Sequence, residues 1–375
     1  MGDISNIEIG WRSALMLAVC SPLLMAALML AFRRVERAAN LWLAFFLLIA
    51  VIAQIPQIIG FSGFYTVWPG LTFAPFNVEL YAGPLLYLHA DRLMRGGKLE
   101  WRKLLLIPGL LQTAYYLWAF LGLGDYKSKW AYSERIHTPY IEPIETLIGI
   151  GLICFAIFAI LRLMRRYRQF LENTQSAARD FDPIWLRRLL IAIIAAGVFV
   201  AGLELIPTFI RPISYVDAFP AQVILTMIVA WLGFEALAKT GVDFPKLPQA
   251  PQTADGQPAP VNDRDWSAEA KALKDAVKAG GWYLEPRLSI RDLAARMGSN
   301  ETYISRTLNK GLGLSFNDFV NGLRIEKAKQ LIAAGEVSIL EVAYASGFNS
   351  KATFNRVFRD MLNMTPSAYK TSQNP

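Results

Sequence analysis

The sequence contains few charged residues and almost no cysteine. Only 18% of its 375 residues are charged, whereas soluble globular domains average about a quarter. Its two cysteines, Cys20 and Cys154, lie inside long apolar runs. This placement excludes a disulfide-stabilised scaffold and suits small core residues. Because 54% of the residues are hydrophobic, extensive disorder is excluded for most of the chain.

Long apolar runs fill the first two thirds of the chain. Residues 13–32 form a run of twenty without a charge, which meets the requirement of about 20 residues for crossing a bilayer core. This run also exceeds the roughly 7–15 apolar residues of a cleavable signal peptide, so we expect it to stay in the protein. Six further runs cover approximately residues 39–59, 75–94, 103–123, 143–163, 187–207 and 217–238. We therefore predict an all-α fold that begins with a seven-helix transmembrane bundle.

The basic residues predict how this bundle is oriented. The segments that would join the spans on one side carry fifteen Lys and Arg residues, and those on the other side carry five. Cytoplasmic loops of membrane proteins are enriched in Lys and Arg. We therefore expect a multi-pass protein of the bacterial inner (cytoplasmic) membrane, with its N-terminus outside and its C-terminus in the cytoplasm.

Composition divides the chain into three parts. Residues 1–240 form the predicted membrane and sensor domain. Residues 241–265 contain five prolines among polar residues, which is typical of a flexible linker. Residues 266–375 are predicted to be soluble and helical, with fifteen basic against ten acidic residues. An excess of positive charge suits either DNA or anionic lipid, so charge alone does not choose between them.

An internal repeat distinguishes these alternatives. Residues 289–308 resemble residues 338–358, with counterparts 49 or 50 positions apart. Each copy begins with the spacing of a helix capping box, Ser289 with Asp292 and Ser338 with Glu341. A glycine then stands where a helix would end, and Asn300 or Ser350 can cap a second helix. Two short helices joined by a glycine-containing turn form a helix-turn-helix unit.

The apolar spacing of each second helix predicts its outward face. Ile304 with Leu308, and Phe354 with Phe358, are four residues apart and would face inward. Arg and Asn side chains suit the reading of base edges in DNA. Any one outward residue could equally be an ordinary solvated residue, but a face repeated on duplicated units favours DNA contact. The candidate DNA-binding residues are Glu301, Thr302, Ser305, Arg306, Lys351, Ala352, Asn355 and Arg356.

The C-terminal region resembles the DNA-binding domain of the AraC/XylS family of bacterial transcription regulators. The stretches that carry the resemblance are LSIRDLAARMG, YISRTLNKGLGLSFNDFVNGLRIEKAKQLI, SILEVAYASGFNSKATFNRVFRD and MTPSAYK. The resemblance implies two helix-turn-helix units bridged by a long helix, with recognition helices at residues 300–309 and 351–361. Three residues depart from the family pattern: Leu308 replaces the usual Phe, Asn309 a usual Lys and Asn363 a usual Gly.

Polar residues within or beside the predicted spans are candidate sensor residues. Charged groups inside a membrane are costly and therefore often functional. We expect an outward-facing polar pocket formed by Glu79, Glu204, Gln54, Gln57 and Asn77. The alternative is that both glutamates are hydrated near the interface or satisfied by neighbouring helices. We predict no catalytic residues, metal site or cofactor, because the two histidines would lie on opposite sides of the membrane.

These features together predict a membrane-integrated, one-component transcription regulator that is not an enzyme. The expected partners are double-stranded promoter DNA, the lipid bilayer, RNA polymerase, a second copy of the chain in a homodimer, and an unidentified small-molecule or envelope signal. A membrane transporter or enzyme with an accessory DNA-binding tail is the alternative. Release of the tail by proteolysis within the linker is a third hypothesis.

Overall fold

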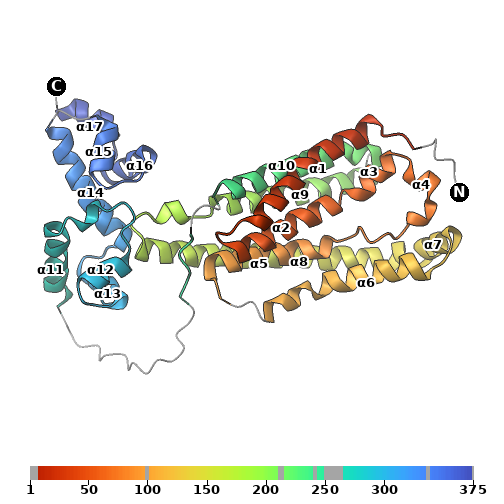
Figure 1. Cartoon of the computed structure of the whole chain (residues 1–375), viewed down its shortest axis with the longest axis horizontal. Coiled ribbons are helices and arrows are strands. Elements are labelled where there is room, and N and C mark those ends of the chain that lie inside the picture. The colour runs from red at the N-terminus through yellow and green to blue at the C-terminus, as the bar shows by residue number, and fades with distance from the viewer. Residues whose placement is uncertain are drawn as a thin grey trace. The chain divides into compact units, whose positions relative to one another are not determined.

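The computed structural model describes residues 7–97, 101–209, 215–239, 243–248, 265–334 and 338–373, with residues 200–209, 215, 218, 232 and 239 described by their backbone alone. Throughout this described part the protein is helical and contains no β-strand, which confirms the predicted all-α class. The chain forms two compact units. The N-terminal unit comprises Met1–Met164 and Pro183–Gln249, and the C-terminal unit comprises Arg165–Asp182 and Ala250–Pro375 (Figure 1).

Long apolar helices make up most of the described part of the N-terminal unit. The helices up to residue 239 are α1 (Trp11–Phe32), α2 (Arg37–Ile52), α3 (Ile55–Phe61), α4 (Phe64–Val67), α5 (Ala82–Arg95), α6 (Ile107–Gly122), α7 (Tyr126–Tyr132), the π-helix η5 (Ser133–Ile141), α8 (Glu142–Thr174), α9 (Ile184–Phe209) and α10 (Tyr215–Lys239). The part of α8 from Arg165 onward belongs to the C-terminal unit. Within the described residues, five helices are long and apolar enough to cross a membrane: Trp11–Phe32, Arg37–Phe61, Trp101–Gly122, Tyr126–Thr174 and Phe219–Ala238. The count of seven spans stays a prediction.

The third predicted run, residues 75–94, contains the short helix α5. Helix α5 has 14 residues, and nearly all of them are buried inside the unit. Its polar side chains have partners there: His89 Nδ1 lies 2.8 Å from the carbonyl oxygen of Ala39, and Asp91 forms ion pairs with Arg102 and Arg95. An interior helix can carry such residues because its neighbours satisfy their hydrogen bonds.

A proline interrupts the second predicted run. Helix α2 ends at Ile52 and α3 begins at Ile55, with Pro56 in the first turn of α3. Proline lacks the backbone N–H that an uninterrupted helix would use at this position, so the chain restarts as a new helix.

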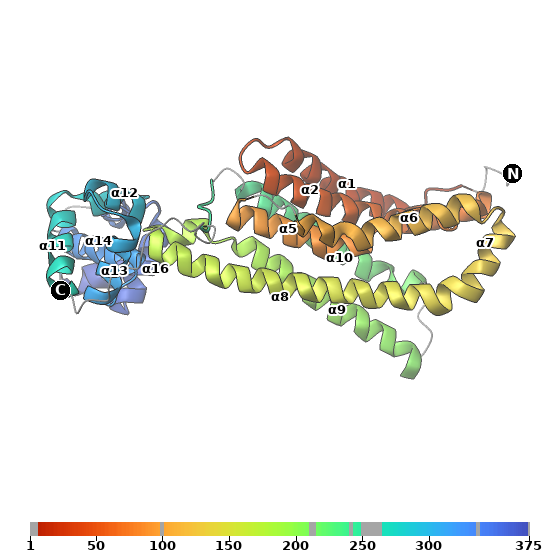
Figure 2. The same cartoon turned by 90° about the horizontal axis from the view of Figure 1, so that it is seen from below.

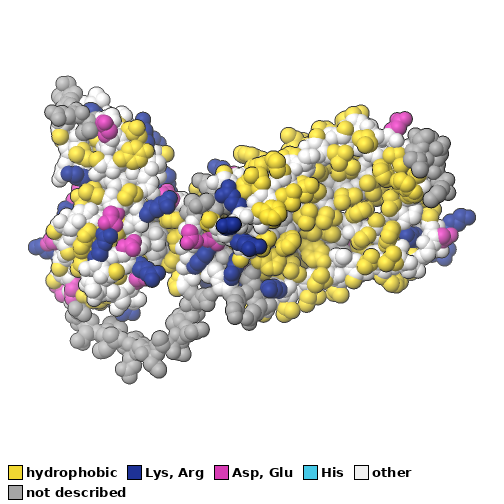
Figure 3. All heavy atoms as spheres, viewed as in Figure 1, with side chains coloured by type: hydrophobic (Ala, Val, Ile, Leu, Met, Phe, Trp, Pro, Cys, Tyr) yellow, Lys and Arg dark blue, Asp and Glu magenta, His cyan; other side chains and the backbone are white. Residues whose placement is uncertain are grey.

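Large hydrophobic side chains cover the outside of the N-terminal unit. They dominate the face seen in Figure 3, whereas charged side chains are spread over the C-terminal unit. Leu28 on α1, Leu111 on α6 and Phe158 on α8 are each more than half exposed. Apolar surface this extensive is unfavourable in water and typical of a region that contacts lipid or another apolar partner.

The beginning of the predicted linker contacts the N-terminal unit. Phe244 is buried, the backbone N–H of Leu247 donates to the carbonyl of Met94 at 2.8 Å, and Lys246 Nζ pairs with Glu36. These contacts hold residues 243–248 against the N-terminal unit, and the flexible linker over residues 241–265 stays a prediction. Local sequence patterns do not indicate these contacts, because the partner residues lie about 150 to 210 positions away. Residues 249–264 lie outside the described part.

The C-terminal unit contains α11 (Trp266–Ala279), α12 (Ile290–Arg296), α13 (Glu301–Gly311), α14 (Phe316–Ala333), α15 (Ile339–Ala345), α16 (Lys351–Leu362) and α17 (Pro366–Gln373). Residues of α14 belong to two apolar cores, and Figure 2 shows the helices of this unit from a second side. Its first half, including Phe319 and Leu323, packs with α11, α12 and α13. Its second half, including Ala328 and Ile332, packs with α15, α16 and α17. One helix thus joins two similar half-domains.

Two glycines on neighbouring helices provide a matched test of packing in the N-terminal unit. A Cβ atom at Gly83 would lie 2.7 Å from the carbonyl oxygen of Leu152 on α8, whereas at Gly151 it would meet nothing within 4 Å. We expect Gly83→Ala to lower the free energy of unfolding by about 1–3 kcal/mol because the two helices must separate. Gly151→Ala should be neutral or stabilising by up to about 1 kcal/mol.

Thermal unfolding of both variants in the same detergent measures this difference. Equal stability of the two variants would contradict the close approach of α5 and α8.

Candidate nucleic-acid interface

Both repeats fold as helix-turn-helix units, α12 with α13 and α15 with α16. The side chain of Ser289 accepts from the backbone N–H of Asp292, and Asp292 accepts in return from the backbone of Ser289. Ser338 and Glu341 make the same reciprocal pair. Two otherwise unpaired backbone donors are satisfied at each helix start. The two predicted capping boxes are therefore confirmed.

A left-handed glycine closes the first helix of each unit. Gly298 has φ +58° and Gly347 has φ +86°. After the turn, Ser299 donates to the carbonyl of Ala294 at 2.9 Å, and Phe348 donates to that of Ala343 at 3.1 Å. This bond pattern is a Schellman motif, which satisfies the last carbonyls of the helix. Each second helix then starts at a side-chain cap, Asn300 or Ser350, as expected.

The caps and the apolar pairs fix the rotation of each second helix. Ile304 and Leu308 are buried in the first core, and Phe354 and Phe358 are buried in the second. Of the candidate DNA-binding residues, Glu301, Thr302, Arg306, Lys351 and Ala352 are exposed, and Ser305, Asn355 and Arg356 are half-buried. The structure thus brings the candidates to the outward face of each helix. Their contact with DNA stays a prediction.

The two equivalent arginines have different surroundings. Arg306 is exposed. Arg356 is half-buried, and its Nε atom is covered without a hydrogen-bond partner among the described residues. Burial and, secondarily, the nearby positive charge of Arg179 lower the pKa of Arg356, with Asp360 and Asp180 opposing the shift. Since the two helices have the same fold, this asymmetry comes from what lies beside the second helix.

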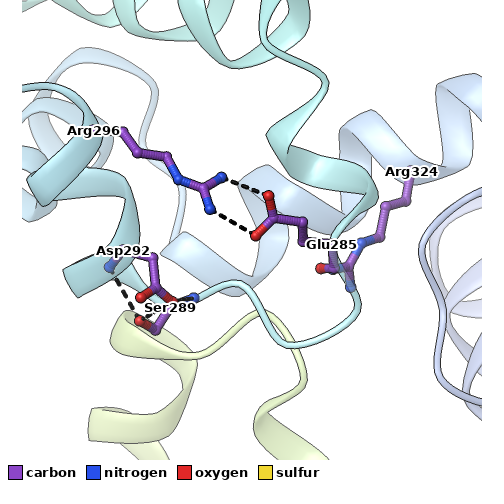
Figure 4. A network of polar contacts seen from close by, with 5 residues as sticks. All are labelled: Glu285, Ser289, Asp292, Arg296 and Arg324. Atoms are coloured by element: carbon purple, nitrogen blue, oxygen red, sulfur yellow. Dashed lines mark hydrogen bonds and ion pairs between the residues drawn. The ribbon is translucent and has the colours of Figure 1, made fainter.

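A buried arginine lies where the two cores meet on α14. Arg324 is 2% exposed, and its Nε and Nη2 donate to the carbonyls of Tyr283 and Glu285 at 2.7 and 2.6 Å. In Figure 4 its guanidinium points at this stretch of backbone, while the carboxylate of Glu285 accepts both Nη groups of Arg296. Desolvation lowers the pKa of Arg324 to about 10, so it stays protonated at neutral pH. Sequence reasoning counted Arg324 only as one more base of a cationic domain.

The length of α14 sets the separation of the two units. Its 18 residues span about 27 Å at 1.5 Å per residue. Successive major grooves on one face of DNA are about 34 Å apart. This helix agrees with the expected long helix between the two helix-turn-helix units.

The predicted sensor residues are only partly brought together. Asn77 Nδ2 donates to the hydroxyl of Tyr116 at 2.8 Å, and Gln112 Nε2 lies 3.4 Å from a carboxylate oxygen of Glu79. Gln54 and Gln57 lie elsewhere, at the start of α3, and the side-chain oxygen of Gln54 is buried without a hydrogen-bond partner in the described region. The side chain of Glu204 lies outside the described part.

Four residues that sequence reasoning did not assign to this site complete what we call the polar cluster. Its members are Asn77, Glu79, Gln112, Tyr116, His137 and Glu145. The Tyr116 hydroxyl donates to Glu145 at 3.1 Å and lies 3.4 Å from His137 Nε2. Polar residues inside the apolar run 103–123 were the signal that could have indicated Gln112 and Tyr116. Among the described residues, no group of three or more His, Cys, Asp and Glu side chains could hold a metal ion.

Comparison with known proteins agrees with this geometry. Residues 293–372 match the sequence profile of a helix-turn-helix domain, and this part of the chain is a helix-turn-helix domain of the AraC/XylS type. An uncharacterized HTH-type transcriptional regulator of Staphylococcus aureus strain COL is 34% identical over 83 residues, 22% of this chain and 11% of its own length. The same values hold for a regulator of that description from strain N315.

A second kind of relative covers more of the chain. Regulatory protein PocR of Salmonella typhimurium is 29% identical over 132 residues, which are 35% of this chain and 41% of PocR. The chain thus spans only about a tenth of the length of the Staphylococcus relatives and less than half of PocR. No solved structure matches the chain significantly.

The two turn glycines give a graded test of the unit geometry. An added Cβ at Gly298 would meet open space, but at Gly347 it would lie 2.7 Å from the carbonyl oxygen of Leu284. We expect Gly298→Ala to cost about 1–2 kcal/mol, the penalty for a left-handed alanine. Gly347→Ala should cost clearly more, because the clash adds to that penalty.

Urea unfolding of the C-terminal unit, followed by circular dichroism, measures both changes. Gly298→Asn is the control, since Asn tolerates the left-handed conformation. A smaller loss for Gly347→Ala than for Gly298→Ala would contradict the described turn.

Proposed function

We propose that the chain is a membrane-integrated, one-component transcription regulator that binds promoter DNA sequence-specifically through its two helix-turn-helix units. The observation that carries this proposal is the pair of recognition helices, α13 and α16, whose apolar sides are buried and whose polar sides carry repeated Arg residues. Arg, Asn, Ser and Thr on such a face suit hydrogen bonding to base edges and phosphates. The similarity to transcriptional regulators of Staphylococcus aureus and to PocR supports the same function.

We further propose that the N-terminal unit lies in the bacterial inner membrane and leaves the DNA-binding domain in the cytoplasm. Five helices of spanning length and apolar composition support the membrane location. The excess of Lys and Arg in one set of connecting segments supports the orientation. A homodimer would double the number of DNA-reading units, and RNA polymerase would be the partner in activation.

The polar cluster is the proposed sensor. Its residues come from four elements: the segment around η3 (Glu79–Tyr81), α6, η5 and the start of α8. A stimulus that changes the hydrogen bonds among them would change how these helices pack. In apolar surroundings, a polar group that loses its hydrogen-bond partner costs more free energy than it does in water. A small chemical change at the polar cluster can therefore shift the equilibrium between two packing arrangements of these helices.

Removal of either recognition arginine should weaken binding to a mapped promoter site. We expect Arg306→Ala and Arg356→Ala each to cost about 1–3 kcal/mol, or roughly 5- to 150-fold in affinity, with relaxed specificity at the base each one reads. Gel shifts or fluorescence anisotropy with the full chain in nanodiscs measure the loss.

Lys329→Ala on α14 is the matched control, because it removes one exposed positive charge away from the recognition helices. Wild-type affinity in either arginine variant, or an equal loss in the lysine variant, would contradict the assigned interface.

Neutralising a sensor carboxylate should make transcription insensitive to the stimulus. We expect Glu79→Gln, or Glu204→Gln, to flatten the dose response of a promoter reporter while the amount of protein in the membrane stays the same. Glu134→Gln is the control, since Glu134 is exposed on η5 and bonds to Trp130. An unchanged dose response in both sensor variants would remove these glutamates from the sensing site.

A further inference from the structure

The segment that follows α8 binds the DNA-binding domain directly. We call residues 175–182 the docking segment; it contains the short 3-10 helix η6 (Ala178–Phe181). The backbone N–H of Ser176 donates to the carbonyl of Leu288 at 3.0 Å, and Gln175 forms an isolated antiparallel bridge with Ser289. The docking segment therefore pairs with the stretch that leads into α12, and both belong to one compact unit.

Side chains of the bridging helix α14 hold the same segment. Asn317 Nδ2 donates to the carbonyls of Gln175 and Ser176 at 3.1 and 2.8 Å. Arg324 Nη2 lies 3.3 Å from Ser176 Oγ. Ser176, Ala177 and Ala178 are all buried. Buried, hydrogen-bonded backbone of this kind is typical of a specific contact, since a buried polar group without a partner is costly.

The docking segment then reaches the start of the second recognition helix. The Asp180 carboxylate accepts a hydrogen bond of 2.8 Å from Asn349, the residue before the N-cap of α16. Arg179 Nη2 lies 3.7 Å from Asp360 on the same helix. A helix N-terminus favours an anion, and in DNA complexes that anion is a backbone phosphate. Asp180 thus puts a protein carboxylate beside the end of α16 at which a phosphate would be favoured.

The repeat provides an internal comparison for this contact. The docking segment contacts the second helix-turn-helix unit at Asn349 and Asp360, and the nearby Arg356 side chain is half-buried. In the first helix-turn-helix unit the equivalent Arg306 is exposed. The difference between the two arginines follows the position of the docking segment.

We propose that the docking segment is an intramolecular ligand of the DNA-binding domain, which contacts the second recognition helix region at Asn349 and Asp360 beside Arg356 and must leave before that helix can bind DNA. This inference rests on the proposed function, because it concerns the regulation of the same interface. In this proposal the docking segment occupies the surface formed by Leu288, Asn317, Arg324 and Asn349. Ser176 and Asp180 of the segment make its main polar contacts.

The inference also identifies a second route from the membrane domain to the DNA. Helix α8 is continuous from Glu142 to Thr174, and it carries Glu145 of the polar cluster near its start and the docking segment directly after its end. A change at Glu145 can therefore reach the docking segment through one helix. The linker at residues 241–265 then serves as a tether, and signalling through it is not required.

The first experiment measures exposure and needs no DNA. In the full chain with Cys20 and Cys154 replaced by alanine, Arg306→Cys and Arg356→Cys are each labelled with a maleimide in nanodiscs. We expect the cysteine at position 356 to react about tenfold more slowly, as a segment docked for about nine tenths of the time would give. Adding Ser176→Lys, which puts an ammonium beside the Arg324 guanidinium, should raise the rate at position 356 and leave that at position 306 unchanged.

Two results of this labelling would overturn the proposal. Equal rates at the two positions would mean that the second helix is not covered. A slow rate at position 356 that Ser176→Lys leaves unchanged would mean that the domain itself, and not the docking segment, covers it.

The second experiment measures DNA affinity with the full chain. We expect Ser176→Lys and Asp180→Ala to raise affinity for a mapped site, the first by about tenfold. Glu172→Lys is the control for added positive charge, because Glu172 is exposed near the end of α8. It should raise affinity by much less than Ser176→Lys does.

Each outcome has a distinct meaning. Lower affinity in Ser176→Lys would overturn the proposal by making the docking segment part of the DNA interface, and unchanged affinity would overturn it by separating docking from binding. If neither the wild type nor any variant binds a duplex at low salt, the proposed function fails instead, and the labelling still judges whether the segment covers α16.

Discussion

The burial of two apolar pairs, each four residues apart, is the constraint on which the DNA-binding domain depends. Ile304 with Leu308, and Phe354 with Phe358, leave each recognition helix one rotation that fills its core. The opposite face must then point outward, whatever residues it carries. Helix α14 contributes to both cores, so the same burial that orients each helix also sets the distance between them. Function at this surface is thus a consequence of packing on the other side of the helix.

Arg324 connects this packing to the rest of the chain. The charged guanidinium is nearly fully buried, and it is retained because backbone carbonyls and Ser176 accept its hydrogen bonds. One of these partners belongs to the domain's own turn and another to the docking segment. In the undocked arrangement that we propose, Arg324 would lose Ser176 as a partner. A signal can shift the equilibrium between the docked and undocked arrangements, because the Arg324 guanidinium has different hydrogen-bond partners in each.

Local signals in the sequence predicted most of the C-terminal fold. Capping boxes, turn glycines and helical apolar spacing are all set by residues within a few positions of one another, and the structure confirms each of them. The long apolar runs likewise predicted helices in the N-terminal part. The internal repeat indicated two helix-turn-helix units, and the resemblance to a family implied the same two units with a long helix between them.

Contacts between distant parts of the chain could not be predicted in this way. The burial of Arg324, the binding of residues 175–182 to α14 and the meeting of His137 with Tyr116 join segments that no local pattern relates. The interior position of α5 explains its polar residues only once its neighbours are known. For these reasons the predicted sensor pocket contained Asn77 and Glu79 but not the other four members of the polar cluster, Gln112, Tyr116, His137 and Glu145.

Selection from a random DNA library by the full chain in nanodiscs tests the central claim most directly. The account predicts enrichment of sequences with two short preferred blocks, separated by about one helical turn, or 10 base pairs, because α14 holds two recognition helices side by side. Recovery of no preferred sequence at modest ionic strength would contradict the account. Selection of only one preferred block would also contradict it, if that block is still selected after Arg306→Ala and after Arg356→Ala.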